Sequence, residues 1–183
     1  MTSTHIVPDD LSFEAAITQT EALIAQMEQR QLSEPDLEAA ITALVATENG
    51  ARGFFVTYLT DARSIADQPT AAVIRALRSS PDIVSELLVK NLAMSSAMAI
   101  THRRNQNQDL AAGSDRVQSR TLALIQQVQL EQLRTKAIQL GDSAATNHGN
   151  YATFLNRWGY DQEQRQVIQQ QMQRITRAMG AGV

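Results

Sequence analysis

Apolar residues recur at intervals of three and four positions through most of this chain, which is the spacing of one face of an α-helix. The first two runs of this kind are Phe13, Ile17, Ile24 and Met27, joined by Thr20, and then Leu37, Ile41, Leu44 and Val45. No window of comparable length alternates apolar and polar residues with the period of two that marks a β-strand. The pattern therefore predicts an all-α fold.

Prolines and capping residues divide this pattern into separate helices. The four prolines, at positions 8, 35, 69 and 81, each lie where a helical pattern is about to start, because proline is tolerated in a first turn and disruptive later. Serine precedes proline and an acid in "SEPD" and "SSPD", and "DQEQ" at 161–164 has the form of a capping box. We expect helices near 10–31, 34–48, 51–64, 70–79, 81–104, 114–140, 144–157 and 162–179.

Length and composition fit one domain. The chain has 183 residues, of which 43% are hydrophobic, and a chain near this length buries roughly 70% of its unfolded surface. We expect a single helical domain over 1–183, with flexible ends at 1–8 and 180–183. The absence of cysteine excludes disulfides, thiolate metal sites and cysteine nucleophiles, and it fits a reducing compartment.

The helix expected over 81–104 differs from the others because apolar residues cover most of its circumference. This distribution predicts a buried central helix in a hairpin with 114–140. Polar residues interrupt its apolar stretch, so we expect no membrane span; they are Glu86, Lys90, Asn91, Ser95 and Ser96. The N-terminus has no basic, apolar leader, and we expect a cytoplasmic protein.

Familiar catalytic and metal-binding motifs are absent from the sequence. No phosphate loop, G-x-S-x-G or H-E-x-x-H occurs, and no Glu lies three positions before any of the three histidines. We therefore expect no metal and no cofactor, and we name no catalytic residue. A serine, a histidine and an aspartate could still converge in space, which the sequence leaves open.

Basic residues gather around the polar stretch between the helices expected over 81–104 and 114–140. His102, Arg103 and Arg104 lie in the last turn of the first helix, where cations complement the dipole. Arg116 and Arg120 would lie in the opening turns of the next helix, where the dipole disfavours cations. Asp109 and Asp115 could neutralise part of this group. The five basic residues are either an internally paired ionic cluster or a site for an anion or an acidic partner.

Two apolar patterns near the C-terminal end are candidate interfaces. Tyr151, Phe154 and Trp158 share one helical face and close the core or form a contact patch, since Trp and Tyr are common anchors of interfaces. Ile168, Met172 and Ile175, continued by Met179, form a narrow stripe on the last helix, which packs on one neighbour or on a second copy.

Charge is unevenly distributed along the chain. Residues 1–50 hold nine acidic residues against Arg30, whereas residues 51–183 hold fifteen basic residues against ten acidic ones. The two parts could attract each other within one chain or between copies. Neither part is strongly basic, and the net charge is −3, which argues against nucleic acid as a partner.

These features favour a non-catalytic regulatory or assembly protein that acts through protein–protein contacts and self-associates as a homo-oligomer. The alternative is a helical protein, or an enzyme, that binds a small ligand or an anion in a pocket near the end of helix 81–104. That alternative depends on the polar residues of this helix, because buried polar groups need partners and a ligand is one kind of partner. They are Asn91, Ser95, Ser96, Thr101 and His102.

Overall fold

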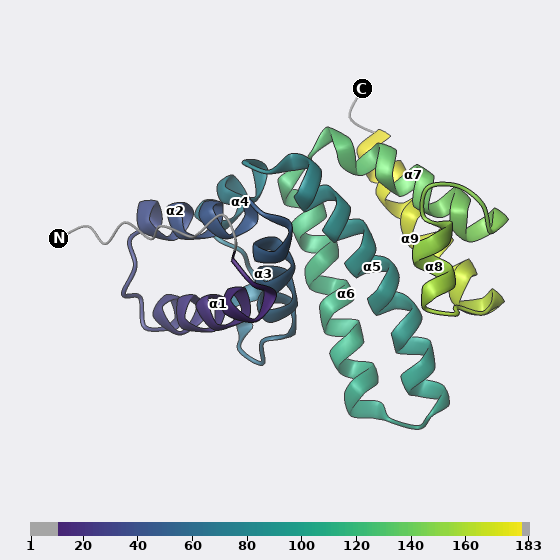
Figure 1. The fold of residues 1–183 in the computed structure, drawn as a ribbon. Helices are drawn as coiled ribbons and strands as arrows, with labels where there is room; N and C mark the ends of the chain where they lie inside the picture. Colours follow the sequence, from purple (N-terminus) through teal and green to yellow (C-terminus); the bar gives the residue numbers. More distant parts are fainter. Residues whose placement is uncertain (1–10, 181–183) are drawn as a thin grey trace. The chain divides into compact units, whose positions relative to one another are not determined.

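The computed structural model describes residues 11–180, and all of the secondary structure in this range is helical (Figure 1). The all-α prediction is confirmed. The sequence predicts flexible ends at 1–8 and 180–183. Of these, residues 1–8 and 181–183 lie outside the described residues. The helices are α1 (Phe13–Glu28), α2 (Glu34–Val45), α3 (Glu48–Thr60), the 3-10 helix η1 (Ser64–Asp67), α4 (Ala71–Arg78), α5 (Pro81–Arg104), α6 (Gln108–Val128), α7 (Glu131–Thr146), α8 (Ala152–Arg157) and α9 (Gln162–Gly180).

The chain divides into two compact units, with the boundary between Leu87 and Leu88 inside α5. The single domain expected over 1–183 therefore stays a prediction. In the first unit α1 packs on α3, and α2 packs on α3 and α4. Its core contains an aromatic group in which Phe54 stacks on Tyr58 and meets Phe55 edge-on, with ring centroids 5.1 and 5.4 Å apart.

Capping side chains decide where the helices of the first unit begin. The hydroxyl oxygens of Ser12, Ser33 and Thr47 accept hydrogen bonds from main-chain N–H groups three residues later, at 3.1–3.3 Å. Each bond satisfies a donor that the helix itself leaves unpaired. The predicted start at "SEPD" is thus confirmed. Pro81 is the first residue of α5, as "SSPD" predicted.

In the second unit, which comprises the described residues from Leu88 onward, α7 packs on α9 and α8 packs on α7. The last turns of α5 lie beside α6, which runs back antiparallel to it (Figure 1). An ion pair between Arg103 and Asp115 joins the two helices. The predicted hairpin is therefore confirmed, although the bounds of its second helix differ from the prediction.

The predicted start of this second helix at Ser114 was wrong, because α6 begins at Gln108. The Oδ1 atom of Asn107 accepts a hydrogen bond from the N–H group of Leu110 and caps α6. Gln106 takes a left-handed φ of 57°, and Asn107 donates to the carbonyl of His102 at 2.9 Å. This Schellman-type ending reverses the chain in three residues.

Two further helix boundaries were also missed. The helix expected over 114–140 ends at Val128, where Gln129 takes a left-handed φ of 48°. The helix expected over 144–157 is divided between the end of α7 and the short α8, since Asn147 takes a φ of 62°. Left-handed backbone stops the i→i−4 ladder, so each of these residues ends its helix.

By length and composition α5 could cross a membrane, and 56% of its most apolar window is buried inside the protein. The core helix of a soluble protein has the same properties.

Candidate functional site

The two arginines that end α5 are engaged in exposed ion pairs. Arg103 contacts Asp115 at 2.5 Å, and Arg104 contacts Asp161 at 2.5 Å and Glu163 of α9. The hydrogen bond from Arg104 lowers the pKa of Asp161 and raises that of the guanidinium. Such exposed pairs contribute little to stability, because water screens the two charges. Their main consequence is that both cations already have carboxylate partners in the same chain.

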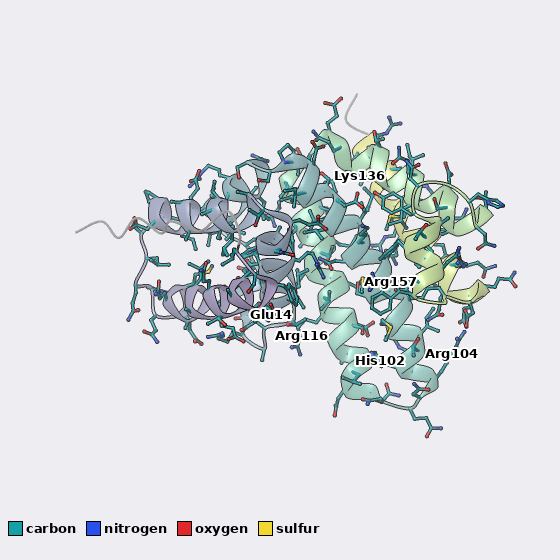
Figure 2. All side chains as sticks on the ribbon, in the orientation of Figure 1. Glu14, His102, Arg104, Arg116, Lys136 and Arg157 are labelled. Atoms are coloured by element: carbon teal, nitrogen blue, oxygen red, sulfur yellow. The ribbon has the colours of Figure 1, made fainter. Side chains whose placement is uncertain are left out.

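The remaining basic residues of this group have other environments. Arg116 is exposed on α6, and Figure 2 shows it on that helix, whereas His102 and Arg104 lie on α5. Arg120 is only 3% exposed and engaged within the protein. Because α6 begins at Gln108, Arg116 and Arg120 lie in its middle, and the dipole argument for them was wrong. The anion or partner site proposed at these residues stays a prediction.

Several polar residues of α5 find their partners inside the chain. The Ser95 hydroxyl donates to the carbonyl of Asn91 at 2.7 Å, and that of Ser96 donates to the carbonyl of Leu92 at 2.6 Å. Thr101 accepts a hydrogen bond from the side chain of Gln164 at 2.8 Å. Three of the groups that suggested a ligand on this helix are therefore satisfied by the protein itself.

Gln164 is the buried connection between α9 and α5. Its Nε2 atom donates to the carbonyl of Ala97 at 3.0 Å as well as to Thr101, and the residue is 7% exposed. Its Oε1 atom accepts from the N–H group of Asp161, whose Oδ1 atom accepts from the N–H group of Gln164. The capping box predicted at 161–164 is thus confirmed.

Replacing Gln164 with leucine is expected to lower the free energy of unfolding by about 2 kcal/mol, because buried polar groups lose their donor and the capping box loses one bond. Urea denaturation followed by circular dichroism measures this change. Gln170→Leu, at an exposed position of the same helix, is the matched control and should change stability by less than about 0.5 kcal/mol. Equal effects of the two substitutions would contradict the role assigned to Gln164.

The aromatic candidates near α8 divide between core and surface. Tyr151 is 4% exposed, and Lys90 places Nζ over the rings of Tyr151 and Phe154, 5.9 and 5.4 Å from their centroids. Trp158, by contrast, is 48% exposed. Tyr151 thus belongs to the core, which is one of the two alternatives expected, whereas Trp158 lies on the surface.

The stripe on α9 faces α7 within one chain. Ile168, Met172 and Ile175 are at most 2% exposed, and a Cβ atom added at Gly141 of α7 would lie 3.3 Å from Cβ of Met172. Of the two alternatives, packing on a neighbouring helix accounts for these three residues. A second copy cannot contact them while α9 remains packed.

A pocket of about 660 Å³ lies where the end of α7 meets the start of α9. We call it the α7–α9 pocket. Its lining consists mainly of amides and small residues, namely Ala144, Ala145, Asn147, Tyr160, Gln162, Arg165, Gln166 and Gln169. Arg165 donates through Nε to the carbonyl of Tyr160 at 3.0 Å and through Nη2 to Oδ1 of Asn156 at 2.9 Å. Burial raises the pKa of Tyr160 to about 12.

Sequence reasoning missed this pocket. Its wall joins two segments separated by α8, and no local pattern shows that they meet. The available signal was an arginine and a tyrosine beside the capping box at 161–164. Within residues 11–180, no group of three or more His, Asp or Glu side chains could hold a metal ion.

Comparison with known proteins places the chain in a family without identifying an activity. Neither the curated proteins nor the solved structures contain a match. The family described as Uncharacterised conserved protein UCP020893 matches residues 12–175, which is most of the chain. The chain therefore belongs to the family Uncharacterised conserved protein UCP020893.

Proposed function

We propose that this protein is a non-catalytic regulatory or assembly factor that acts through protein–protein contacts and self-associates. The observation that carries the proposal is the exposure of Trp158, whose side chain is large and 48% accessible. Tryptophan and arginine are over-represented among the residues that dominate binding energy at interfaces. Arg157, which precedes Trp158, is also exposed.

The segment that carries Trp158 is held at both ends. Before it, Leu155 is fully buried. On both sides of it, Arg165 binds Asn156 and the carbonyl of Tyr160. An anchored segment loses little conformational entropy on binding, so an exposed aromatic residue on it can contribute more of its contact energy to affinity.

Self-association is tested by light scattering after size-exclusion chromatography over a range of concentrations. We expect a dimer or larger species whose Trp158 emission shifts to shorter wavelength as concentration rises. Trp158→Ala should weaken association by about tenfold or more, since interface anchors contribute at least about 2 kcal/mol. Leu110→Ala removes another exposed apolar side chain, 52% exposed on α6, and is expected to leave association unchanged.

The opposite results would overturn this proposal. A chain that stays monomeric at high concentration, with constant Trp158 emission, would contradict self-association. An unaltered dimer in Trp158→Ala would show that this residue is no anchor.

A second candidate function is the binding of a small ligand, and the α7–α9 pocket favours it. Its volume of about 660 Å³ lies in the range of about 300–1,000 Å³ typical of small-molecule sites. The pocket is built on the start of α9, which is bound to the end of α5 through Gln164 and Arg104. No described residue of α5 lines the pocket, and its charged residue is Arg165.

A further inference from the structure

The guanidinium group of Arg165 is only partly satisfied. Nε and Nη2 donate to neutral acceptors, the carbonyl of Tyr160 and the amide oxygen of Asn156. The third nitrogen, Nη1, is buried and has no hydrogen-bond partner among residues 11–180. Buried donors are normally paired, and an unpaired donor on a cation costs more than one on a neutral group. This nitrogen could therefore donate to an acceptor that the described part of the chain does not supply.

The hydroxyl group of Tyr160 is a second buried donor that lacks an acceptor among the described residues. Tyr160 is 6% exposed, and its hydroxyl oxygen is buried without a hydrogen-bond partner in the described part of the chain. Since its pKa is raised to about 12 by burial, the group keeps its proton at neutral pH and remains a donor. Both residues line the α7–α9 pocket, and their unpaired donor atoms are buried beneath its surface.

The rest of the pocket wall matches an acceptor-rich, negatively charged guest. Among the described residues that line it, Arg165 is the only charged one, and no carboxylate is present. The neighbouring carboxylate of Asp161 is already bound to Arg104. Side-chain amides supply further donors and acceptors, and they belong to Asn147, Gln162, Gln166 and Gln169.

We propose that the α7–α9 pocket binds a small polar molecule through an oxyanion group, a carboxylate or a phosphate, whose oxygens accept hydrogen bonds from Nη1 of Arg165 and from the hydroxyl of Tyr160 when these two side chains turn toward the pocket. Charge-assisted bonds of this kind are stronger than neutral ones, and a planar guanidinium suits both oxyanions. The surrounding amides then bind the polar remainder of the molecule. This inference rests on the second proposed function and names its ligand class.

The test uses the full chain and three probes at constant ionic strength: inorganic phosphate, succinate and neutral erythritol. Binding is followed by the NMR signals of the Arg165 Nε–H group and of the single indole, Trp158. We expect saturable shifts with phosphate, succinate or both, and none with erythritol. Shifts with phosphate alone identify a phosphate-bearing ligand, and shifts with succinate alone identify a carboxylate-bearing one.

Three variants connect the binding to the pocket. Arg165→Gln should weaken the affinity for the active anion by about tenfold or more, and Tyr160→Phe by several-fold. Tyr160→Phe should also raise the melting temperature of the free protein, because it removes a buried, unpaired hydroxyl. Arg174→Gln is the matched control, because Arg174 lies on α9 and, among the described residues, bonds only to Gln171 at 3.0 Å. This variant should bind the anion as the unaltered chain does.

Failure of this inference is distinguishable from failure of ligand binding in general. If erythritol shifts the signals and neither anion does, the oxyanion class is wrong and small-ligand binding stands. If an anion binds with unchanged affinity to both Arg165→Gln and Tyr160→Phe, the site lies elsewhere and the inference is overturned. If no probe causes a saturable shift, the oxyanion inference is rejected and the second proposed function loses its support.

Discussion

Replacing Ile168 with alanine is expected to lower the free energy of unfolding by about 3 kcal/mol, because truncating a buried aliphatic side chain loses its transfer free energy and leaves a cavity. Ile168 is 0% exposed on α9, which packs against α7. The close approach of Gly141 to Met172 shows how tightly these helices meet. Urea denaturation followed by circular dichroism at 222 nm gives the change directly.

Ile138→Ala is the matched control for this prediction. Ile138 lies on α7 and is 42% exposed, so the same truncation should change stability by less than about 0.5 kcal/mol. If Ile168 instead belonged to a surface that contacts a second copy, Ile168→Ala would leave the monomer's stability unchanged and lower the oligomeric state. That pattern would contradict the packing described for α9.

Gly53→Ala is the second substitution with a large expected effect. A Cβ atom at Gly53 of α3 would lie 2.4 Å from Cβ of Ala16 and 3.0 Å from main-chain atoms of α1. Neither contact can be relieved by rotating a flexible side chain, so α1 and α3 would have to separate. We expect a loss of about 3 kcal/mol, the upper end of the usual cost of overpacking. Thermal and urea unfolding both report it.

Gly113→Ala makes the same chemical change where the space is open. Gly113 lies inside α6, and an added Cβ atom would meet nothing within 4 Å. This substitution should stabilise the protein by about 0.5–1 kcal/mol, because alanine loses less backbone entropy than glycine in a helix. If both substitutions shifted stability in the same direction, the contact at Gly53 could not be the reason for its effect.

Most helices could be predicted because their signals are local. Ser33 with Asp36, Pro81, and the pair Asp161 and Gln164 act within one turn, and the structure shows the corresponding helix starts. The start of α6 was missed although Asn107 is also a local capping signal, because the helix expected over 114–140 begins only after Gly113. Gly113 instead lies within a helix, where glycine is tolerated at a small cost.

The breaks after α6 and α7 could not be predicted in the same way. Gln129 and Asn147 take left-handed backbone conformations, which cost a non-glycine residue roughly 1–2 kcal/mol. The local sequence around Gln129 favours a continuous helix. Packing between segments distant in sequence compensates for such strain, and the periodicity of one segment carries no information about it.

The sequence by itself determined the helical class, most helix starts and the absence of disulfides and other cysteine chemistry. These features depend on single residues or on neighbours within a turn or two. Only the tertiary structure decided which polar groups have partners. Arg104, a candidate binding residue by its position, is paired with Asp161, 57 residues away. Arg165, which no motif marks and which lines a pocket, keeps a buried nitrogen that has no partner within residues 11–180. Burial and pairing arise where distant segments meet, so the sequence alone does not separate a paired arginine from one that keeps an unpaired nitrogen.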